Sequence, residues 1–138
     1  MQATHILETC LYVDDLDAAA AFYQDVLGLE RFAGAPGRHV FFRCGQGVFL
    51  LFNPTQTERA AGDVPAHGAR GPGHVAFAML SEEVAAWREQ LTARGVAIEA
   101  EVSWPRGGYS LYFRDPAGNS VELTTPQTWG LVSIANRA

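Results

Sequence analysis

Apolar and polar residues alternate along several short stretches of the chain, and this alternation is typical of β-strands that bury one face. In the first stretch, residues 6–13, Glu8 lies on the opposite face from Leu11. The same pattern, with turn residues between the stretches, predicts a series of further strands. They are expected near 29–33, 40–43, 48–52, 73–79, 96–98, 109–114 and 120–124.

Two other stretches have helical spacing instead. Leu16, Ala20 and Tyr23 recur at intervals of three or four residues, which predicts a helix over 16–27 with one apolar face. A similar stripe over 82–94 predicts a second helix. Each helix follows the first strand of a group and precedes three more strands.

The order strand, helix, strand, strand, strand therefore occurs twice, and the segment 53–72 between the two copies is rich in Gly and Pro without periodicity. A sheet covered by one helix leaves its other face open, so two such halves must pair. We predict an α+β fold of two βαβββ modules, whose curved mixed sheets pair around a cavity with the helices outside. The expected parts of this single domain are a first module (1–52), a linker (53–72), a second module (73–126) and a C-terminal tail (127–138).

Composition narrows the functional classes. The chain has 138 residues, 15 acidic against 10 basic side chains, and a formal charge of −5, so a nucleic-acid partner is not expected. All basic residues are Arg, which excludes a Schiff-base lysine and a Walker-type phosphate loop. Two cysteines without CxxC spacing exclude a disulfide scaffold. No apolar run reaches membrane-spanning length and no stretch is typical of a signal peptide, so we expect a cytoplasmic protein that does not contact membranes.

Three motifs carry a resemblance to a known family. Residues 13–16 followed by Phe22-Tyr23, residues 73–77, and above all the closing stretch 112–123 resemble the vicinal oxygen chelate superfamily. That superfamily contains glyoxalase I, extradiol dioxygenases, fosfomycin-resistance enzymes and bleomycin-binding proteins. The resemblance covers roughly residues 6–125. It implies a small-molecule substrate, one divalent metal ion inside the paired sheets and, commonly, a homodimer.

The resemblance places the metal ligands at Glu8, Leu50, His74 and Glu122. Strand parity turns Glu8, His74 and Glu122 toward the cavity, where two carboxylates and an imidazole would be costly without a cation. His5, three residues before Glu8, is a rival ligand that a regular strand turns to the other face. This oxygen-rich set favours Mn²⁺ or Mg²⁺, with Fe²⁺, Ni²⁺ and Zn²⁺ still open. Glyoxalase I uses a fourth protein ligand where Leu50 stands, so glyoxalase I activity itself is not expected.

Three further residues are candidates for catalysis. His39 is either a general base pointing into the cavity or an exposed histidine at a strand edge. Tyr112 is placed to donate to a substrate oxygen. Arg114 pairs with a substrate carboxylate or phosphate, with Glu122, or with a partner in a structural salt bridge. The loop 104–108 either covers the cavity mouth or forms a tight turn.

Two functions follow from these residues. The first is a metal-dependent enzyme that chelates its substrate through vicinal oxygens, with isomerase, lyase, transferase and dioxygenase chemistry all open. The second is a metal-free protein that binds or sequesters a drug-like ligand, as bleomycin-resistance proteins do. His74 and Glu122 favour the first function, whereas Glu8 and Leu50 keep the second open.

Overall fold

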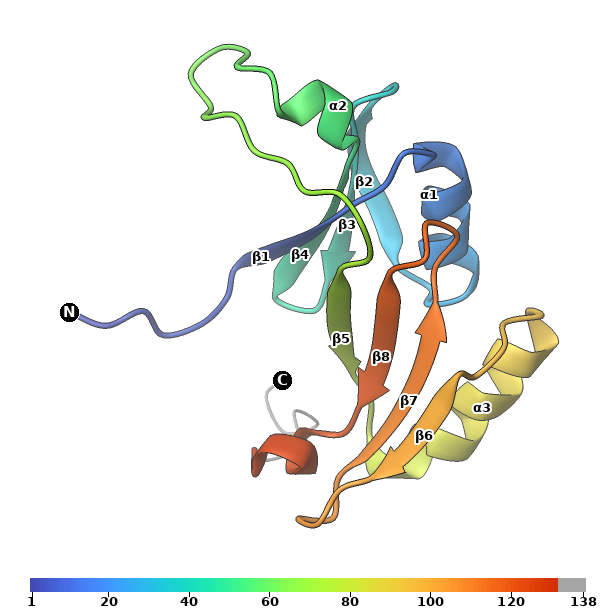
Figure 1. Cartoon of the computed structure of the whole chain (residues 1–138). Coiled ribbons are helices and arrows are strands. Elements are labelled where there is room, and N and C mark those ends of the chain that lie inside the picture. Colours follow the sequence, from blue (N-terminus) through green and yellow to red (C-terminus); the bar gives the residue numbers. More distant parts are fainter. Residues whose placement is uncertain (132–138) are drawn as a thin grey trace. The chain divides into compact units, whose positions relative to one another are not determined.

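The computed structural model describes residues 1–131, and the chain divides into two compact units, Met1–Gly73 and His74–Ala138 (Figure 1). No helix in the described part of the chain combines the length and the apolar character needed to cross a membrane. Most of the predicted tail, residues 132–138, lies outside the described residues.

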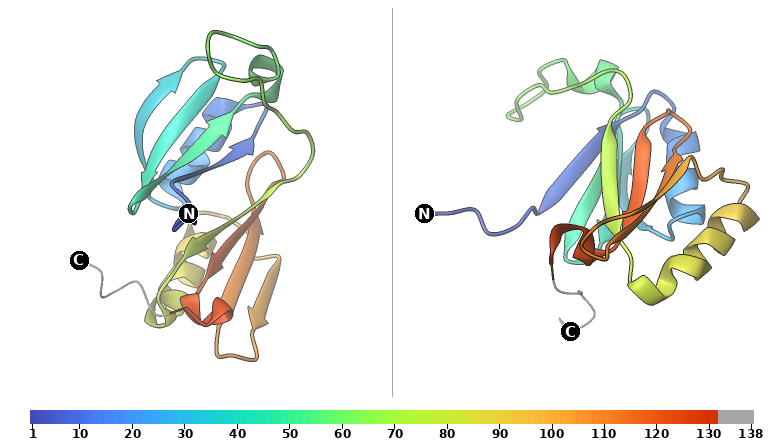
Figure 2. Two further views of the ribbon diagram at one scale, coloured as in Figure 1. Left: turned by 90° about the vertical axis from the view of Figure 1, so that its left-hand side faces the viewer. Right: turned by 60° about the horizontal axis from the view of Figure 1, so that its bottom comes forward.

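The first unit is one mixed sheet of four strands, in the order β1-β4-β3-β2 (Figure 2). β1 runs parallel to β4, and the other neighbours are antiparallel. Its elements are β1 (Glu8–Tyr12), α1 (Leu16–Asp25), β2 (Glu30–Ala35), β3 (His39–Cys44), β4 (Gly47–Phe52) and α2 (Pro54–Thr57). The short helix α2 lies within the segment that the sequence predicts as a linker.

The second unit repeats this topology, with a sheet in the order β5-β8-β7-β6. β5 is parallel to β8, as β1 is to β4. Its elements are β5 (His74–Ala78), η1 (Ser81–Glu83), α3 (Val84–Ala93), β6 (Ala100–Ser103), β7 (Tyr109–Arg114), β8 (Ser120–Thr124) and η2 (Pro126–Trp129). The predicted α+β class with two βαβββ modules is confirmed.

The strand register is also the same in the two units. The paired residues are Glu8–Val48 and Cys10–Leu50 in the first unit, and His74–Ser120 and Ala76–Glu122 in the second. Glu8 and His74 therefore hold equivalent positions, as do Leu50 and Glu122. The duplication that the sequence predicts is therefore also found in the strand register.

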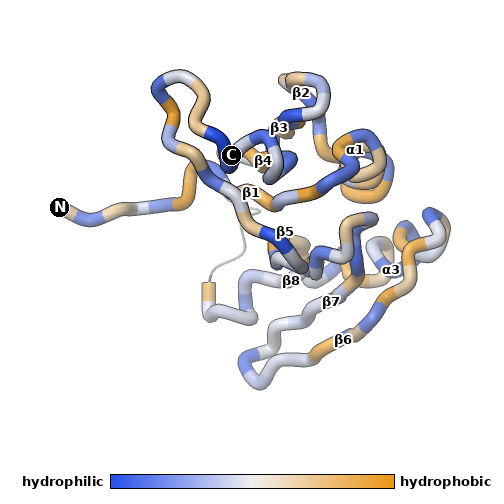
Figure 3. The backbone as a smooth tube through the Cα atoms, turned by 45° about the horizontal axis from the view of Figure 1, so that its top comes forward, coloured by the Kyte–Doolittle hydropathy of each residue, from blue (hydrophilic) through white to orange (hydrophobic). Residues whose placement is uncertain are grey.

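Each helix covers one face of its own sheet, and hydrophobic positions recur along both α1 and α3 (Figure 3). Asp15 caps α1, since its side chain accepts a hydrogen bond from the Ala18 N–H at 3.0 Å. On the sheet side Tyr23 is fully buried, with its ring centroid 4.8 Å from that of Phe49. This aromatic packing leaves the opposite face of the first sheet free of helix α1.

The start of the second unit's helix is held by one of its own acidic side chains. The Glu83 carboxylate accepts from the Leu80 backbone N–H at 2.8 Å. The Leu91 side chain is fully buried where the helix packs on its sheet. Because a carboxylate near a helix N-terminus offsets the helix dipole, Glu83 both satisfies a free N–H and stabilises the first turn.

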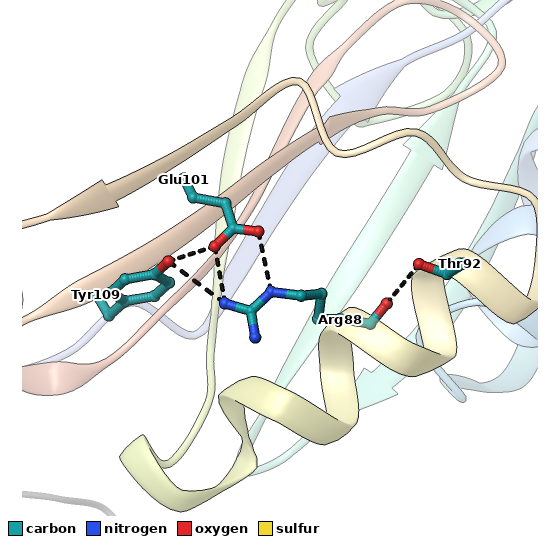
Figure 4. A network of polar contacts seen from close by, with 4 residues as sticks. All are labelled: Arg88, Thr92, Glu101 and Tyr109. Atoms are coloured by element: carbon teal, nitrogen blue, oxygen red, sulfur yellow. Dashed lines mark hydrogen bonds and ion pairs between the residues drawn. The ribbon is translucent and has the colours of Figure 1, made fainter.

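A polar network ties α3 to the strands β6 and β7 (Figure 4). The guanidinium of Arg88 donates to both carboxylate oxygens of Glu101, at 3.0 and 2.8 Å. The hydroxyl of Tyr109 donates to the same carboxylate. These hydrogen bonds, Arg88 first, lower the pKa of Glu101 to about 2. The carboxylate is therefore ionised at neutral pH and holds the outer surface of the helix to the sheet edge.

The turn between β7 and β8 is closed by its own side chains. The Asp115 carboxylate accepts from the backbone N–H groups of Ala117 and Asn119, both at 2.9 Å, and from the Asn119 side-chain amide. Gly118 adopts a φ of +84°, a conformation that residues with a Cβ rarely adopt. This turn sets the register that places Tyr112 opposite Glu122.

Candidate functional site

Strand pairing arranges the open face of the first sheet in three rows of side chains. The rows are Glu8–Val48–Arg43, Cys10–Leu50–Phe41 and Tyr12–Phe52–His39. The alternate positions, including Leu11, Phe42 and Phe49, are buried on the face that packs against α1. The predicted parity of the first strand is confirmed, since Glu8 lies opposite the core residue Leu11.

This open face lines a cavity of about 720 Å³ within the first unit. Its apolar wall includes aromatic rings from three strands. The polar groups come from β1 and from His67 in the segment 53–72. The apolar residues are Phe32, Phe41, Val48, Leu50, Phe52 and Val64, and the titratable ones are Glu8, Cys10, Tyr12 and His67. The size and lining suit a small ligand with an apolar body.

The second unit carries a close pair of two predicted metal ligands. His74 Nε2 lies 3.3 Å from Glu122 Oε2, and the Glu122 side chain is only 9% exposed. His74 Nδ1 lies 3.0 Å from the Ser120 carbonyl oxygen, which can only accept, so Nδ1 donates. The lone pair of Nε2 then faces a buried carboxylate. A lone pair and a carboxylate oxygen at this distance favour a proton or a cation between the two groups.

Tyr112 lies beside this pair. Its ring stacks on that of His74, with centroids 6.4 Å apart and planes 25° apart. Burial, followed by a hydrogen bond to the Glu122 carboxylate, raises the pKa of Tyr112. The phenol therefore stays protonated at neutral pH and donates to Glu122, which leaves less freedom for the carboxylate to rotate.

His39 contacts two aromatic residues of the first unit's cavity. Its ring stacks on Phe41 at 4.2 Å and meets Phe52 edge-on at 6.0 Å. Burial, and then the neighbouring Arg38 charge, lowers the pKa of His39, so the imidazole is neutral at neutral pH. Its Nδ1 atom is buried without a hydrogen-bond partner in the described part of the chain. His39 is thus half-buried among aromatic rings.

Arg114 is engaged with another residue of its own unit. Its guanidinium donates to both carboxylate oxygens of Glu99, at 2.6 and 3.0 Å, and to the Gly118 carbonyl at 3.1 Å. The Arg114 hydrogen bond lowers the pKa of Glu99. Of the pairings that the sequence leaves open for Arg114, the structure contains the salt bridge.

His67 was not among the predicted site residues, and it lies in the aperiodic segment 53–72. Its Nδ1 is 2.7 Å from the Tyr12 hydroxyl, and its ring meets Phe52 edge-on at 4.7 Å. The His67 N–H donates to the Thr57 carbonyl at 2.9 Å. Because these contacts connect residues far apart in the chain, a single histidine between Gly and Pro residues carries no local signal of them.

The loop 104–108 forms the turn between β6 and β7. Trp104 is half-buried, and its indole N–H donates to the Ser110 hydroxyl at 2.8 Å. Gly108 is buried against Thr128, and a Cβ there would lie 2.4 Å from the Thr128 backbone nitrogen. Gly108 therefore permits close packing of the backbone, rather than providing a hinge.

Within either unit, residues 1–131 contain no group of three His, Cys, Asp or Glu side chains close enough to hold a metal ion. Two of the predicted ligands, His74 and Glu122, lie together in the second unit, and Glu8 belongs to the first. The pair nevertheless fits a divalent cation chemically. A metal-binding histidine commonly donates its other N–H to a carbonyl, as His74 does to Ser120.

A model of one protein family matches residues 4–123, and its description is the Glyoxalase/Bleomycin resistance protein/Dioxygenase superfamily. The chain belongs to this superfamily. The predicted resemblance is therefore confirmed over most of the chain.

Individual proteins are also similar to this chain. A crystal structure named lactoylglutathione lyase, from Agrobacterium tumefaciens, is 46% identical with a TM-score of 0.91, and the match covers 95% of this chain and 100% of that one. A protein of Pseudomonas aeruginosa described as uncharacterized protein PA2024 is 31% identical, over 92% of this chain and 90% of its own length.

A structure of the fosfomycin resistance protein FosX from Listeria monocytogenes, in complex with Mn(II) and a dihydroxypropylphosphonic acid, is 24% identical with a TM-score of 0.69. That match covers 94% of this chain and 98% of the other. At this identity the likeness concerns the fold alone.

Proposed function

We propose that this member of the superfamily is a divalent-metal-dependent enzyme, whose small substrate chelates the cation through two neighbouring oxygens. His74 and Glu122 are the central ligands, with Glu8 as the third. The observation that carries the proposal is the His74 Nε2 atom facing the buried Glu122 carboxylate at 3.3 Å, with Nδ1 already donating to a carbonyl.

Glu8 is included because it holds the position in β1 that His74 holds in β5. It lines the open face of the first sheet. The proposal requires Glu8 to meet the His74–Glu122 pair, either from the same chain or from a second copy in a homodimer. Two carboxylates and one imidazole leave coordination positions for a substrate. Mn²⁺ and Mg²⁺ suit these ligands best, and Fe²⁺, Ni²⁺ and Zn²⁺ are further candidates.

Each residue of the pair then has a defined task. The Ser120 carbonyl holds His74 in the tautomer whose Nε2 can bind a cation, and Tyr112 orients the Glu122 carboxylate by donating to it. When bound, the cation supplies Lewis-acid stabilisation of negative charge on the substrate oxygens. The single O–H of Tyr112 can donate to a substrate oxygen beside His74 only in place of Glu122, and its ring stacks on that of His74.

We propose a substrate other than that of a lactoylglutathione lyase, although a 46% identical relative has that name. In the first unit, Leu50 holds the place that Glu122 holds in the second, and it lines the cavity. A leucine can neither bind a cation nor take up a proton. We therefore expect no turnover of S-lactoylglutathione, and turnover at an enzymatic rate would contradict this part of the proposal.

The experiment that tests the site is a titration of the chelator-treated protein with Mn²⁺, followed by electron paramagnetic resonance. We expect one ion per chain for the wild type, and a loss of affinity of about tenfold or more for His74→Ala and for Glu122→Gln. Glu99→Gln is the matched control and should bind as the wild type does, because Glu99 is paired with Arg114. His5→Ala tests the rival ligand and should also bind as the wild type does, because His5 is exposed and lies before β1. Full occupancy in both site variants, or no binding by the wild type, would exclude the proposed site.

A second candidate is a metal-free protein that binds or sequesters an aromatic ligand. The aromatic wall of the first unit's cavity, formed by Phe32, Phe41 and Phe52, favours it. The Mn²⁺ titration separates the two functions, since the second predicts no stoichiometric cation binding. A cytoplasmic location and a homodimer belong to both proposals.

A further inference from the structure

The Tyr12–His67 pair forms a polar corner in the cavity of the first unit. Both residues line the cavity, and the Tyr12 hydroxyl is 2.7 Å from His67 Nδ1. The Phe52 ring packs edge-on against the imidazole at 4.7 Å, and the backbone N–H of His67 is bound to Thr57, which is buried. The imidazole is therefore positioned by contacts on its ring and on its backbone.

The direction of the Tyr12–His67 hydrogen bond determines which ring nitrogen of His67 carries the proton. Burial, followed by the neighbouring Cys10, raises the pKa of Tyr12, so its hydroxyl is protonated throughout the physiological range. With the Tyr12 hydroxyl as the donor, Nδ1 is the acceptor and the proton of a neutral ring is on Nε2. The hydrogen bonds of His67 within residues 1–131 use only its backbone and Nδ1. The Nε2–H group is therefore available to a ligand.

We propose that this corner is a recognition site for a carboxylate or carbonyl oxygen of a small aromatic ligand. His67 Nε2 donates to that oxygen, and the aromatic body lies against Phe41, Leu50 and Phe52. Tyr12 is a positioning residue, because it acts through the imidazole. The inference goes beyond the proposed cation site and does not need a cation.

The polar corner lies at the end of β1 that is remote from Glu8, which suits an anionic or oxygen-bearing group of a ligand. Glu8 and Tyr12 lie at the two ends of β1 on the same face, four residues or about 13 Å apart at the usual rise of a strand. A carboxylate bound at His67 therefore lies far from the Glu8 carboxylate, and the repulsion between them is largely screened at physiological salt. The apolar row Cys10–Leu50–Phe41 separates the two ends.

A fluorine NMR titration with 4-fluorobenzoate tests the proposal on the full chain. We expect saturable binding to the wild type and affinity lower by about tenfold or more in His67→Leu, because the donor to a charged group is lost. His67→Gln should recover part of the affinity, since its amide places an N–H donor near the position of Nε2. His5→Gln is the matched control and should bind as the wild type does.

A separate measurement tests the positioning role of Tyr12. In nitrogen-15 spectra of the ring, Tyr12→Phe should increase the share of the Nδ1–H tautomer of His67 and weaken 4-fluorobenzoate binding. A residue with a purely structural role would not change the tautomer. An unchanged tautomer and unchanged affinity in Tyr12→Phe would exclude the positioning role.

Two further outcomes decide the proposal as a whole. No binding of 4-fluorobenzoate by the wild type, or equal affinity in the wild type and a folded His67→Leu variant, would overturn it. 4-Fluorotoluene, which has no acceptor oxygen, should not distinguish these two proteins, and the amide NMR spectrum reports whether the variant is folded. Repeating the titration with Zn²⁺ added keeps this test separate from the cation site, since the effect of His67 is expected with and without the ion.

Discussion

At the scale of single residues, the carboxylates of the second unit differ in their exposure and in the charge of their partners. Glu99 and Glu101 are each held by an arginine and are exposed enough that water screens the pairs. Glu122 is buried, and its neighbours are an imidazole and a phenol, neither of which is permanently charged. The exposed pairs therefore hold elements together. The buried Glu122 carboxylate, by contrast, has no permanently charged partner among the described residues.

Glu101 should make stability depend on pH. Its folded-state pKa of about 2 lies below the ordinary value of about 4.3, so its contribution is present above pH 4.3 and is lost as the pH falls toward 2. Urea unfolding of Glu101→Gln should show a loss of up to about 1 kcal/mol at pH 7, and a smaller difference from the wild type at pH 3. Glu89→Gln, on the same helix, is the control. A difference that does not change with pH would show that the charge is not responsible.

At the scale of elements, the alternation of side chains was enough to predict seven of the eight strands and the duplication. These features depend on local periodicity, which the sequence contains directly. The strand expected near 96–98 lies instead at Ala100–Ser103, because the Val96 N–H is bound to the Leu91 carbonyl at the end of α3.

The hydrogen-bond partners of Arg114 and Tyr12 could not be predicted, because these contacts join residues far apart in the sequence. Glu99 precedes β6 and His67 lies in an aperiodic segment, so only the folded chain brings them to their partners. The same limit applies to Glu8, whose ligand role stays a prediction from duplication and resemblance.

The contact between the β6–β7 turn and η2 gives a prediction about packing. A methyl group at Gly108 would lie 2.4 Å from the backbone nitrogen and Cα of Thr128, which cannot give way as a flexible side chain would. We expect Gly108→Ala to lower the free energy of unfolding by about 1–3 kcal/mol. Gly68→Ala is the control, because its Cβ would meet neighbours at an ordinary distance of 3.5 Å. Equal urea midpoints for the two variants would contradict the close approach.

At the scale of the whole molecule, the proposed cation site takes ligands from both units. If ligands from both units bind one ion, the ion should stabilise both against unfolding, by about 2.7 kcal/mol at a concentration one hundred times its Kd. We expect Zn²⁺ to raise the melting temperature of the wild type and to remove any separate transition of one unit. In Glu8→Gln the stabilisation should shrink. An ion that stabilises this variant as fully as the wild type would show that the first unit takes no part.

The identical register of the two sheets has a consequence for protein design. Where the second unit has Tyr112 opposite Glu122, the first has Phe41 opposite Leu50. The same backbone pairing thus carries an apolar pair in the first unit and a polar pair in the second. Two substitutions, Phe41→Tyr and Leu50→Glu, would give the first unit the polar pair of the second on a backbone that already has the required pairing.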